Sequence, residues 1–225
     1  MSEVSFKDFD ILSEQDKAEA VALLHRYDQL EKQDVCQQDF ITFIKHMWPD
    51  FIEGSHHKII AEKFNKIADN KLKRLIVCLP PRHSKSEFAS TFFPAWMMGR
   101  RGNLKIIQTT HTAELAVRFG RKVRNIIDSE DYQHVFPDLQ LQADNKSAGR
   151  WTSNQEGEFF AAGVGGAITG RGADLLIIDD PHSEQDALSP KALESAYEWY
   201  TSGPRQRLQP GGIIVIVMTR WSTKD

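Results

Sequence analysis

The residues with the clearest chemical potential lie in segment 80–87, PPRHSKSE. A loop that binds nucleotide phosphates needs inward-facing backbone N–H groups, a lysine for the outer phosphates and a hydroxyl for Mg²⁺. Lys85 and Ser86 supply the last two, and a helix starting there adds the positive end of its dipole. The usual pattern GxxxxGK[ST] is not met, because Leu79 and Ser84 occupy the glycine positions. Taken alone, the segment also fits a basic turn capped by a serine.

Two adjacent carboxylates, Asp179 and Asp180, follow the apolar run LLII at 175–178. A buried strand that ends in two acids is costly unless a cation accompanies it. In a Walker B element the first acid, Asp179, holds Mg²⁺ through water and the second orients the attacking water. An acidic turn before a proline is the alternative. Together with Lys85 and Ser86, the pair favours a site for ATP and Mg²⁺.

Two further segments carry candidate residues. Thr219 and Arg220 close the apolar run IIVIV at 213–217, where a hydroxyl and a cation can sense the γ-phosphate, although a salt-bridged strand end fits equally well. The glycine-rich segment 163–172 precedes a strand, whereas a dinucleotide fingerprint follows one. It predicts a mobile loop that presents Arg171 as an arginine finger, in cis or to a neighbouring subunit. A loop arginine paired with a surface acid is the other interpretation.

The elements that must position these residues alternate between strand and helix. Short apolar runs predict strands at 75–79, 105–110, 158–162, 175–178 and 213–217. Helical periodicity predicts helices from Ser86 to a kink or end near Pro94, and over 113–127 and 190–201. This order predicts an α/β fold with a mostly parallel sheet, in which ligands bind beyond the carboxyl ends of the strands.

The first seventy residues differ in their hydrophobic pattern from the rest of the chain and are predicted to be mostly helical. Residues 13–33 predict an amphipathic helix with Ser13 as N-cap and with Ala20, Leu23, Leu24 and Tyr27 at helical spacing. Further helices are expected over 37–48 and 57–69. We therefore divide the chain into a helical segment or lid at 1–70, packed on a core at 71–225.

Composition restricts the class of protein. The 225 residues carry a net charge of −3, from 28 basic and 31 acidic residues, which argues against a surface coated for nucleic acid but leaves room for a local basic patch. Two cysteines give no disulfide framework, and no apolar run approaches the roughly 18 residues of a membrane span. A soluble intracellular protein is expected.

These motifs together resemble the ATPase half of the large terminase subunits of tailed phages and prophages. The resemblance covers about residues 40–225 and rests on PPRHSKSEFAS, the strand end TTH, GVGGAITGRGADLLIIDDPHS, YEWYTSGPRQRLQPGG and VMTRW, in this order. It implies a P-loop NTPase fold of the ASCE type, with an extra strand between the Walker A and Walker B strands. It also implies ATP hydrolysis that drives double-stranded DNA through a portal protein, in a homo-oligomeric ring that works with a small terminase subunit in the cytoplasm of the infected cell.

The resemblance also implies roles for single residues. Lys85, Ser86 and Arg82 match the Walker A lysine, hydroxyl and arginine, and Asp179 matches the Walker B aspartate. Asp180 falls where many members carry the catalytic glutamate, so that Glu184 is a second candidate. Thr219 and Arg220 match the coupling motif, and Arg171 matches a trans-acting arginine. The nucleotide is expected to contact Pro81, Arg82, His83, Ser84, Lys85, Ser86, Glu87, Thr219 and Arg220.

Three points stay open on the sequence alone. The adenine-contacting residue is Gln38, His56 or His57, and the helix at 113–127 carries possible phosphate contacts in Arg118, Arg121, Lys122 and Arg124, for which a solvated face is the other interpretation. The family's second domain is a nuclease; because the sequence stops at Asp225, we expect it to be absent and DNA cleavage with it. The rival functions are a helicase-like ATPase core, a nucleotide-dependent assembly module with little turnover, and a two-metal hydrolase using Asp179, Asp180, His182 and His111.

Overall fold

The computed structural model describes residues 13–168 and 170–223, apart from the side chains of residues 143–146. In this part of the chain seven strands form one sheet, in the order β1-β7-β6-β2-β5-β4-β3. The strands are β1 (Arg74–Cys78), β2 (Lys105–Thr110), β3 (Leu141–Ser147), β4 (Arg150–Ser153), β5 (Glu158–Gly163), β6 (Ala173–Asp179) and β7 (Leu208–Met218). The helical elements are α1 (Glu14–Gln38), α2 (Phe40–Met47), α3 (Ser55–Ala68), the π-helix η2 (Glu87–Phe92), α4 (Phe93–Arg100), α5 (Ala113–Ile127), α6 (Glu130–Val135), α7 (Pro190–Ser202) and the short 3₁₀ turns η3 (Asp186–Leu188) and η4 (Pro204–Arg207).

The strands from β1 to β5 in this order run parallel, and the hairpin β3–β4 continues the sheet antiparallel to β5. The predicted α/β fold with a mostly parallel sheet is therefore confirmed. Strand β7 lies between β1, which leads into Lys85, and β6, which ends at Asp179. This is the position of the extra strand in an ASCE-type sheet. The hairpin β3–β4 was not predicted from the sequence.

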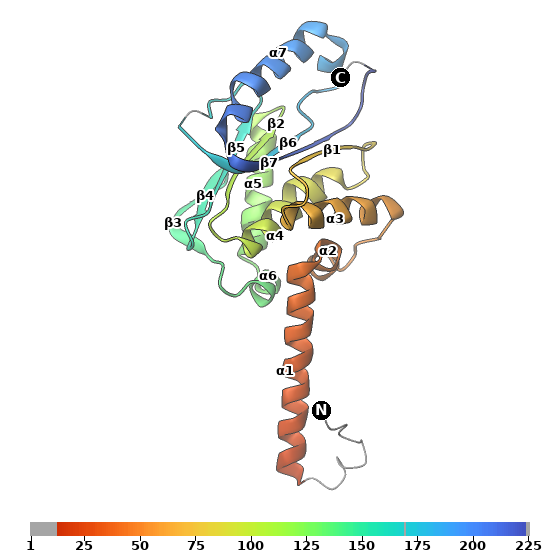
Figure 1. Ribbon diagram of the computed structural model, residues 1–225, viewed down its shortest axis with the longest axis vertical. Helices are drawn as coiled ribbons and strands as arrows, with labels where there is room; N and C mark the ends of the chain where they lie inside the picture. Colours follow the sequence, from red (N-terminus) through yellow and green to blue (C-terminus); the bar gives the residue numbers. More distant parts are fainter. Residues whose placement is uncertain (1–12, 169, 224–225) are drawn as a thin grey trace.

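Side chains alternate between the two faces of the sheet, as strand geometry requires. Leu175 and Ile177 belong to the large core, whereas Leu176 and Ile178 belong to a small separate one. We call the first side the inner face and the second the outer face. Helices α2 to α5 and η2 contribute to the core on the inner face, and α7 lies along the outer face (Figure 1). Asp179 continues the alternation of Leu175 and Ile177 and therefore points to the inner face.

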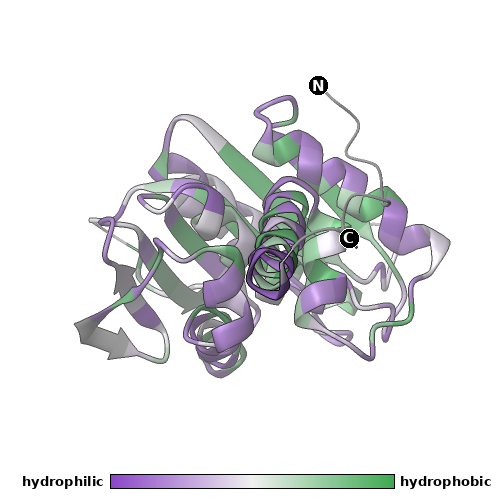
Figure 2. Ribbon diagram, turned by 90° about the horizontal axis from the view of Figure 1, so that it is seen from below, coloured by the Kyte–Doolittle hydropathy of each residue, from purple (hydrophilic) through white to green (hydrophobic). Residues whose placement is uncertain are grey.

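Helices α2 and α3 share the inner core with the rest of the protein. Phe40 at the start of α2 is fully buried and makes edge-on ring contacts with Phe64, Phe88 and Phe93, at centroid distances of 5.1, 5.6 and 5.8 Å. Hydrophobic residues gather on the central strands in Figure 2, with hydrophilic residues on the outer turns of the surrounding helices. The helices before residue 70 and the sheet after it therefore fold around one common core.

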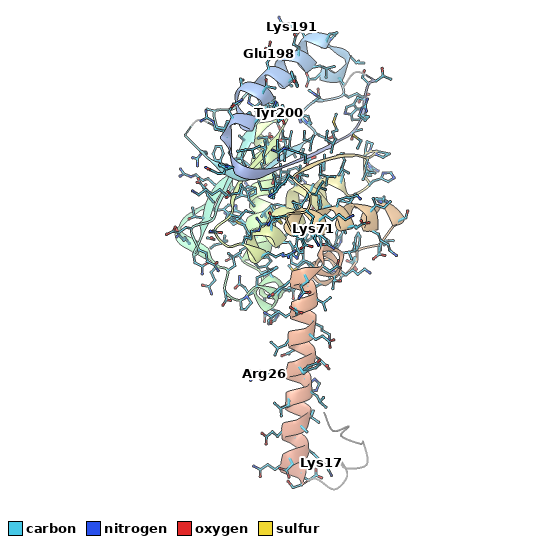
Figure 3. The ribbon with its side chains drawn as sticks, viewed as in Figure 1. Lys17, Arg26, Lys71, Lys191, Glu198 and Tyr200 are labelled. Carbon is cyan, nitrogen blue, oxygen red and sulfur yellow. The ribbon has the colours of Figure 1, made fainter. Side chains whose placement is uncertain are left out.

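Helix α1 begins after Ser13, whose side chain accepts a hydrogen bond from the Asp16 N–H, so the predicted N-cap is confirmed. Its expected apolar face, however, is not packed on the core: Leu23, Leu24 and Tyr27 are 60, 59 and 64 % exposed. The helix projects from the body, with Lys17 and Arg26 marking its free part (Figures 1 and 3). Within the described residues no helix, α1 included, is long and apolar enough to cross a membrane.

The helix after Ser86 is not a continuous α-helix. It starts at Lys85, becomes the π-helix η2, and returns to α-helical hydrogen bonding in α4. At the junction the Phe93 N–H bonds the Phe88 carbonyl, five residues back. Pro94, the second residue of α4, has no N–H to continue the helical hydrogen bonds from η2, which fits the change of helix geometry at this point. The change in helix geometry therefore falls where the sequence places a kink or an end.

Candidate functional site

The loop between β1 and η2 has the backbone of an anion-binding turn despite its lack of glycine. Arg82 and Ser84 adopt left-handed backbone angles, with φ of 63° and 59°. Such residues turn neighbouring N–H groups toward one side and form a concavity for anions. Ser84 holds one of the two glycine positions of the usual pattern, and its conformation is one that glycine adopts without strain. A non-glycine residue in this region costs about 1–2 kcal/mol.

The helical segment that starts at Lys85 and continues into η2 is called the loop helix, and its residue Ser86 meets Asp179 at the end of β6. The Ser86 hydroxyl donates a hydrogen bond to Asp179 Oδ1 over 3.0 Å. Asp179 is 2 % exposed, and its second oxygen, Oδ2, is buried without a hydrogen-bond partner. Burial raises the pKa of Asp179 to about 6, opposed by the hydroxyls of Ser90 and Ser86 and by Lys85, and assisted by the neighbouring charge of Asp180. The Ser90 hydroxyl acts by proximity, since it makes no hydrogen bond of normal geometry.

Lys85 and Asp180 form the second contact of the site. Lys85 Nζ lies 3.0 Å from Asp180 Oδ2, and the two side chains are 8 and 30 % exposed. Asp180 Oδ1 accepts a hydrogen bond of 2.7 Å from the backbone N–H of Thr219, at the end of β7. Asp180 also has a left-handed backbone, with φ of 42°. The Asp180 carboxylate thus joins the ends of β6 and β7 to the start of the loop helix.

The residues at this site fit a Mg²⁺ ion whose coordination shell is completed by other ligands. Ser86 and Asp179 offer a hydroxyl and an orphaned carboxylate oxygen side by side. No three His, Cys, Asp or Glu side chains in the described part of the chain are grouped as a metal site would need. Mg²⁺ commonly takes one or two protein oxygens, several waters and substrate phosphates. The arrangement suits that mode and gives no all-protein metal cage.

The rest of segment 80–87 lies around this centre. Arg82 and His83 are exposed, and the His83 ring Nδ1 lies 2.9 Å from the Pro81 carbonyl. Glu87 forms an ion pair with Lys122 of α5, so its carboxylate is held by α5. Lys122 is therefore paired within the protein.

Arg171 lies away from the site. It forms an ion pair with Glu158, the first residue of β5, and its guanidinium stacks 4.0 Å from the Phe160 ring centroid. Since β5 runs parallel to β2 and β6, Glu158 marks the amino edge of the sheet, opposite the loop that follows β1. Arg171 is therefore held at the edge of the sheet opposite Lys85. Glu184, the second candidate for orienting water, is exposed after β6 and makes no ion pair with Lys85 among the described residues.

The coupling residues divide into a buried and an exposed member. Thr219 is 6 % exposed and contacts Asp180 through its backbone, whereas Arg220 is exposed and donates to the Ser222 carbonyl over 3.3 Å. Thr219 is thus joined to the acidic pair directly. The Arg220 side chain contacts the segment that follows β7.

The residue set of a two-metal hydrolase does not converge. Hydrogen bonds from Ser183 lower the pKa of Asp186, and the nearby His182 and His111 act in the same direction. Asp179 and Asp180, by contrast, contact Ser86 and Lys85. Within the described residues, no group of three His, Cys, Asp or Glu side chains provides the metal site that the rival hydrolase interpretation needs.

Of the three candidates for the adenine contact, only the histidines lie beside the loop. The His56 ring is 5.5 Å from the His83 ring and 3.8 Å from the His57 ring, between centroids. The Nε2 atoms of His56 and His57 are buried without a partner. Gln38 lies at the end of α1, where it bonds Asp34 and lines a hollow together with Arg100, at the far end of α4.

Sequence reasoning missed a group of buried polar side chains next to the site. Ser90, Thr91 and Gln108 are at most 3 % exposed, and their hydroxyl and amide groups have no hydrogen-bond partner. Gln108 follows Ile106 by two positions on β2 and so shares the inner face with the loop helix. The signal that could have found it is a glutamine directly after two isoleucines in the strand KIIQTT.

Comparison with known proteins gives a fold likeness only. No protein-family model matches the sequence, and no curated protein matches it. Among solved structures, the large terminase of bacteriophage HK97 aligns with a TM-score of 0.48 and 12 % sequence identity, over 75 % of this chain and 33 % of that one. The chain thus spans about one third of the length of that protein. The fold is established by the sheet order and by the position of β7 between β1 and β6.

Proposed function

We propose that this chain is the ATP-hydrolysing motor domain of a large terminase subunit, which drives double-stranded viral DNA into a procapsid. The observation that carries the proposal is the meeting of Lys85 and Ser86 with Asp180 and Asp179 at the carboxyl edge of a parallel sheet. Ligands bind at this edge in α/β proteins. The sequence resemblance supplies the DNA substrate, the portal and small-subunit partners, the ring and the host cytoplasm.

In this proposal each residue of the site has one task. The N–H groups of segment 81–86 and Lys85 bind the phosphates, while Ser86 and Asp179 hold Mg²⁺. The ion neutralises phosphate charge when bound. Asp180 orients the attacking water once Lys85 has turned to the phosphates. Thr219, bonded to Asp180, passes the change to β7 and to Arg220.

Arg171 and the base contact complete the proposal. Because Arg171 is tied to Glu158 at the opposite edge, we assign it to a neighbouring subunit's site in the ring and not to its own. His56 is the better candidate for the base contact, since its ring lies beside the phosphate loop.

The test is a calorimetric titration of a non-hydrolysable ATP analogue with Mg²⁺ into the wild type, Lys85→Ala and Asp179→Asn. Both variants should bind about ten- to a hundredfold more weakly, or about 1.4–2.7 kcal/mol. Lys191→Ala on α7 is the matched control, because Lys191 is an exposed lysine away from the loop (Figure 3). Equal binding by all four proteins, or none by the wild type, refutes the assignment.

A second function, a nucleotide-dependent assembly module with little turnover, is favoured by one observation. Asp180 is one methylene shorter than the usual glutamate and is held by Lys85 and Thr219. Binding that is normal in the titration, together with hydrolysis that stays absent when DNA and assembled rings are supplied, would select this function.

A further inference from the structure

Ser90 is a buried hydroxyl without a hydrogen bond, placed next to a buried oxygen without a hydrogen bond. It is 0 % exposed, and its Oγ has no partner among the described residues. Asp179 Oδ2 is in the same condition. A buried polar group left unpaired costs free energy, so such groups usually serve a bound ligand, a water or a change of partner.

The position of Ser90 relative to Ser86 places the Ser90 hydroxyl on the side of the helix that faces Asp179. The two serines are four residues apart on one helical segment, which places them on the same side of it. Ser86 already donates to Asp179 Oδ1 over 3.0 Å. Helix η2, which carries Ser90, packs directly against β6, the strand that ends at Asp179.

The π-helix provides the setting for a second donor. All residues from Phe88 to Phe92 are buried, so the wide turns of η2 direct Ser90 and Thr91 into the protein interior. Short π-helical stretches are frequent at functional sites. Ser86, in contrast, is half-buried at the open end of this segment, where a ligand can reach it.

We infer that Ser90 is a positioning residue for Asp179: its hydroxyl donates to the carboxylate when Ser86 leaves that carboxylate to bind Mg²⁺. In the nucleotide-free protein Ser86 holds Oδ1. Once the Ser86 hydroxyl serves as a metal ligand, Ser90 keeps the carboxylate in the orientation that the ion needs. This inference rests on the proposed nucleotide site but assigns a residue that the phosphate-loop pattern does not contain.

The test measures how much Mg²⁺ is needed for half-maximal binding of a non-hydrolysable ATP analogue. Loss of a hydrogen-bonding partner behind a metal ligand commonly weakens metal binding about ten- to a hundredfold. We expect Ser90→Ala to need about tenfold more Mg²⁺, Ser90→Cys to fall between it and the wild type, and binding of the analogue without Mg²⁺ to stay unchanged. Thr91→Val is the matched control, because Thr91 is also buried with an unpaired hydroxyl, and it should behave as the wild type.

A second readout separates positioning from a structural role. Without ligand, Ser90→Ala should unfold at a temperature no lower than the wild type, because it removes an unpaired buried hydroxyl. If Ser90→Ala does not fold, Ser90→Cys decides. An unchanged Mg²⁺ requirement, or an equal shift in Thr91→Val, overturns the inference. Lys85→Ala tells the two failures apart: if it binds normally, the nucleotide site itself is wrong; if it does not bind while Ser90→Ala is normal, only the role of Ser90 is wrong.

Discussion

Lys85 and Asp180, which come from the two ends of one proposed nucleotide site, are bonded to each other, with Nζ and Oδ2 3.0 Å apart. Lys85 is 8 % exposed, so its charge is removed from water and depends on this partner. A phosphate that enters the loop offers Lys85 a second anion. On the proposed function, nucleotide binding would therefore exchange one ion pair for another. It would release one oxygen of the Asp180 carboxylate, while the other oxygen stays bonded to the Thr219 N–H.

Asp180→Asn should separate binding from hydrolysis. The amide keeps an oxygen for the Thr219 N–H but loses the charge that holds Lys85, so the nucleotide no longer has to break an ion pair. We expect binding of the ATP analogue to tighten by up to about tenfold and the hydrolysis rate to fall at least about a hundredfold. Glu184→Gln is the control, and it should leave both values unchanged. A larger loss of turnover in Glu184→Gln would transfer the water-orienting role to Glu184.

The effect of replacing Ser84 on binding and stability should depend on the backbone conformation that the new residue allows, and not on its side-chain chemistry. Ser84 has φ of 59°, which glycine adopts freely and β-branched residues avoid. Ser84→Gly should bind the ATP analogue as well as the wild type and gain up to about 1 kcal/mol in unfolding free energy. Ser84→Val should lose binding at least about tenfold. Calorimetry and chemical denaturation measure both effects, and equal behaviour of the two variants would contradict the conformational argument.

Arg171→Ala should affect stability more than nucleotide binding in the single chain. Loss of the Glu158 ion pair and of the stacking on Phe160 should lower the unfolding free energy by about 1–2 kcal/mol. The affinity for the ATP analogue should not change, whereas hydrolysis by assembled rings should fall sharply. Arg26→Ala, which replaces an exposed arginine on α1, serves as the control. A weaker affinity in the isolated Arg171→Ala chain would show that the arginine reaches its own site.

Asp179→Asn should stabilise the protein without ligand in a pH-dependent way. The folded-state pKa of Asp179 is raised to about 6 by burial, so folding favours the protonated form and the stability it contributes is lost as the pH rises from about 4 through 6. The variant should therefore exceed the wild type by up to about 3 kcal/mol at pH 8, and by little near pH 4. Urea unfolding in the presence of a chelator, at several pH values, measures the difference directly. A difference that is independent of pH would contradict burial of the carboxylate as its cause.

The strands and helices that carry the site could be predicted because their patterns are local. The run KIIQTT and the helix 113–127 fall at the observed bounds of β2 and α5. The hairpin β3–β4 could not be predicted, since QADNKS and RWTS show no regular alternation of apolar residues. Helix α1 has helical spacing, but spacing alone does not tell whether a partner covers the apolar side.

The site itself was predictable where a topological rule applies. Lys85, Ser86, Asp179 and Asp180 follow parallel strands and therefore meet at one edge. The same rule, applied to Arg171, places it at the other edge, because this residue precedes β6. The left-handed loop and the π-helix could not be read from the sequence, since segment 80–87 lacks glycine and EFASTF is compatible with an ordinary α-helix.

The projecting α1 gives the molecule an unusual hydrodynamic character. A helix of 25 residues is about 38 Å long. Among the described residues, most of its length is exposed, and it is fixed near Cys36, whose carbonyl accepts a hydrogen bond from the Trp96 indole. The particle should therefore tumble anisotropically and sediment more slowly than a sphere of its mass. Amide exchange should form a gradient along the rod, fastest near Glu14 and slowest where the helix enters the body.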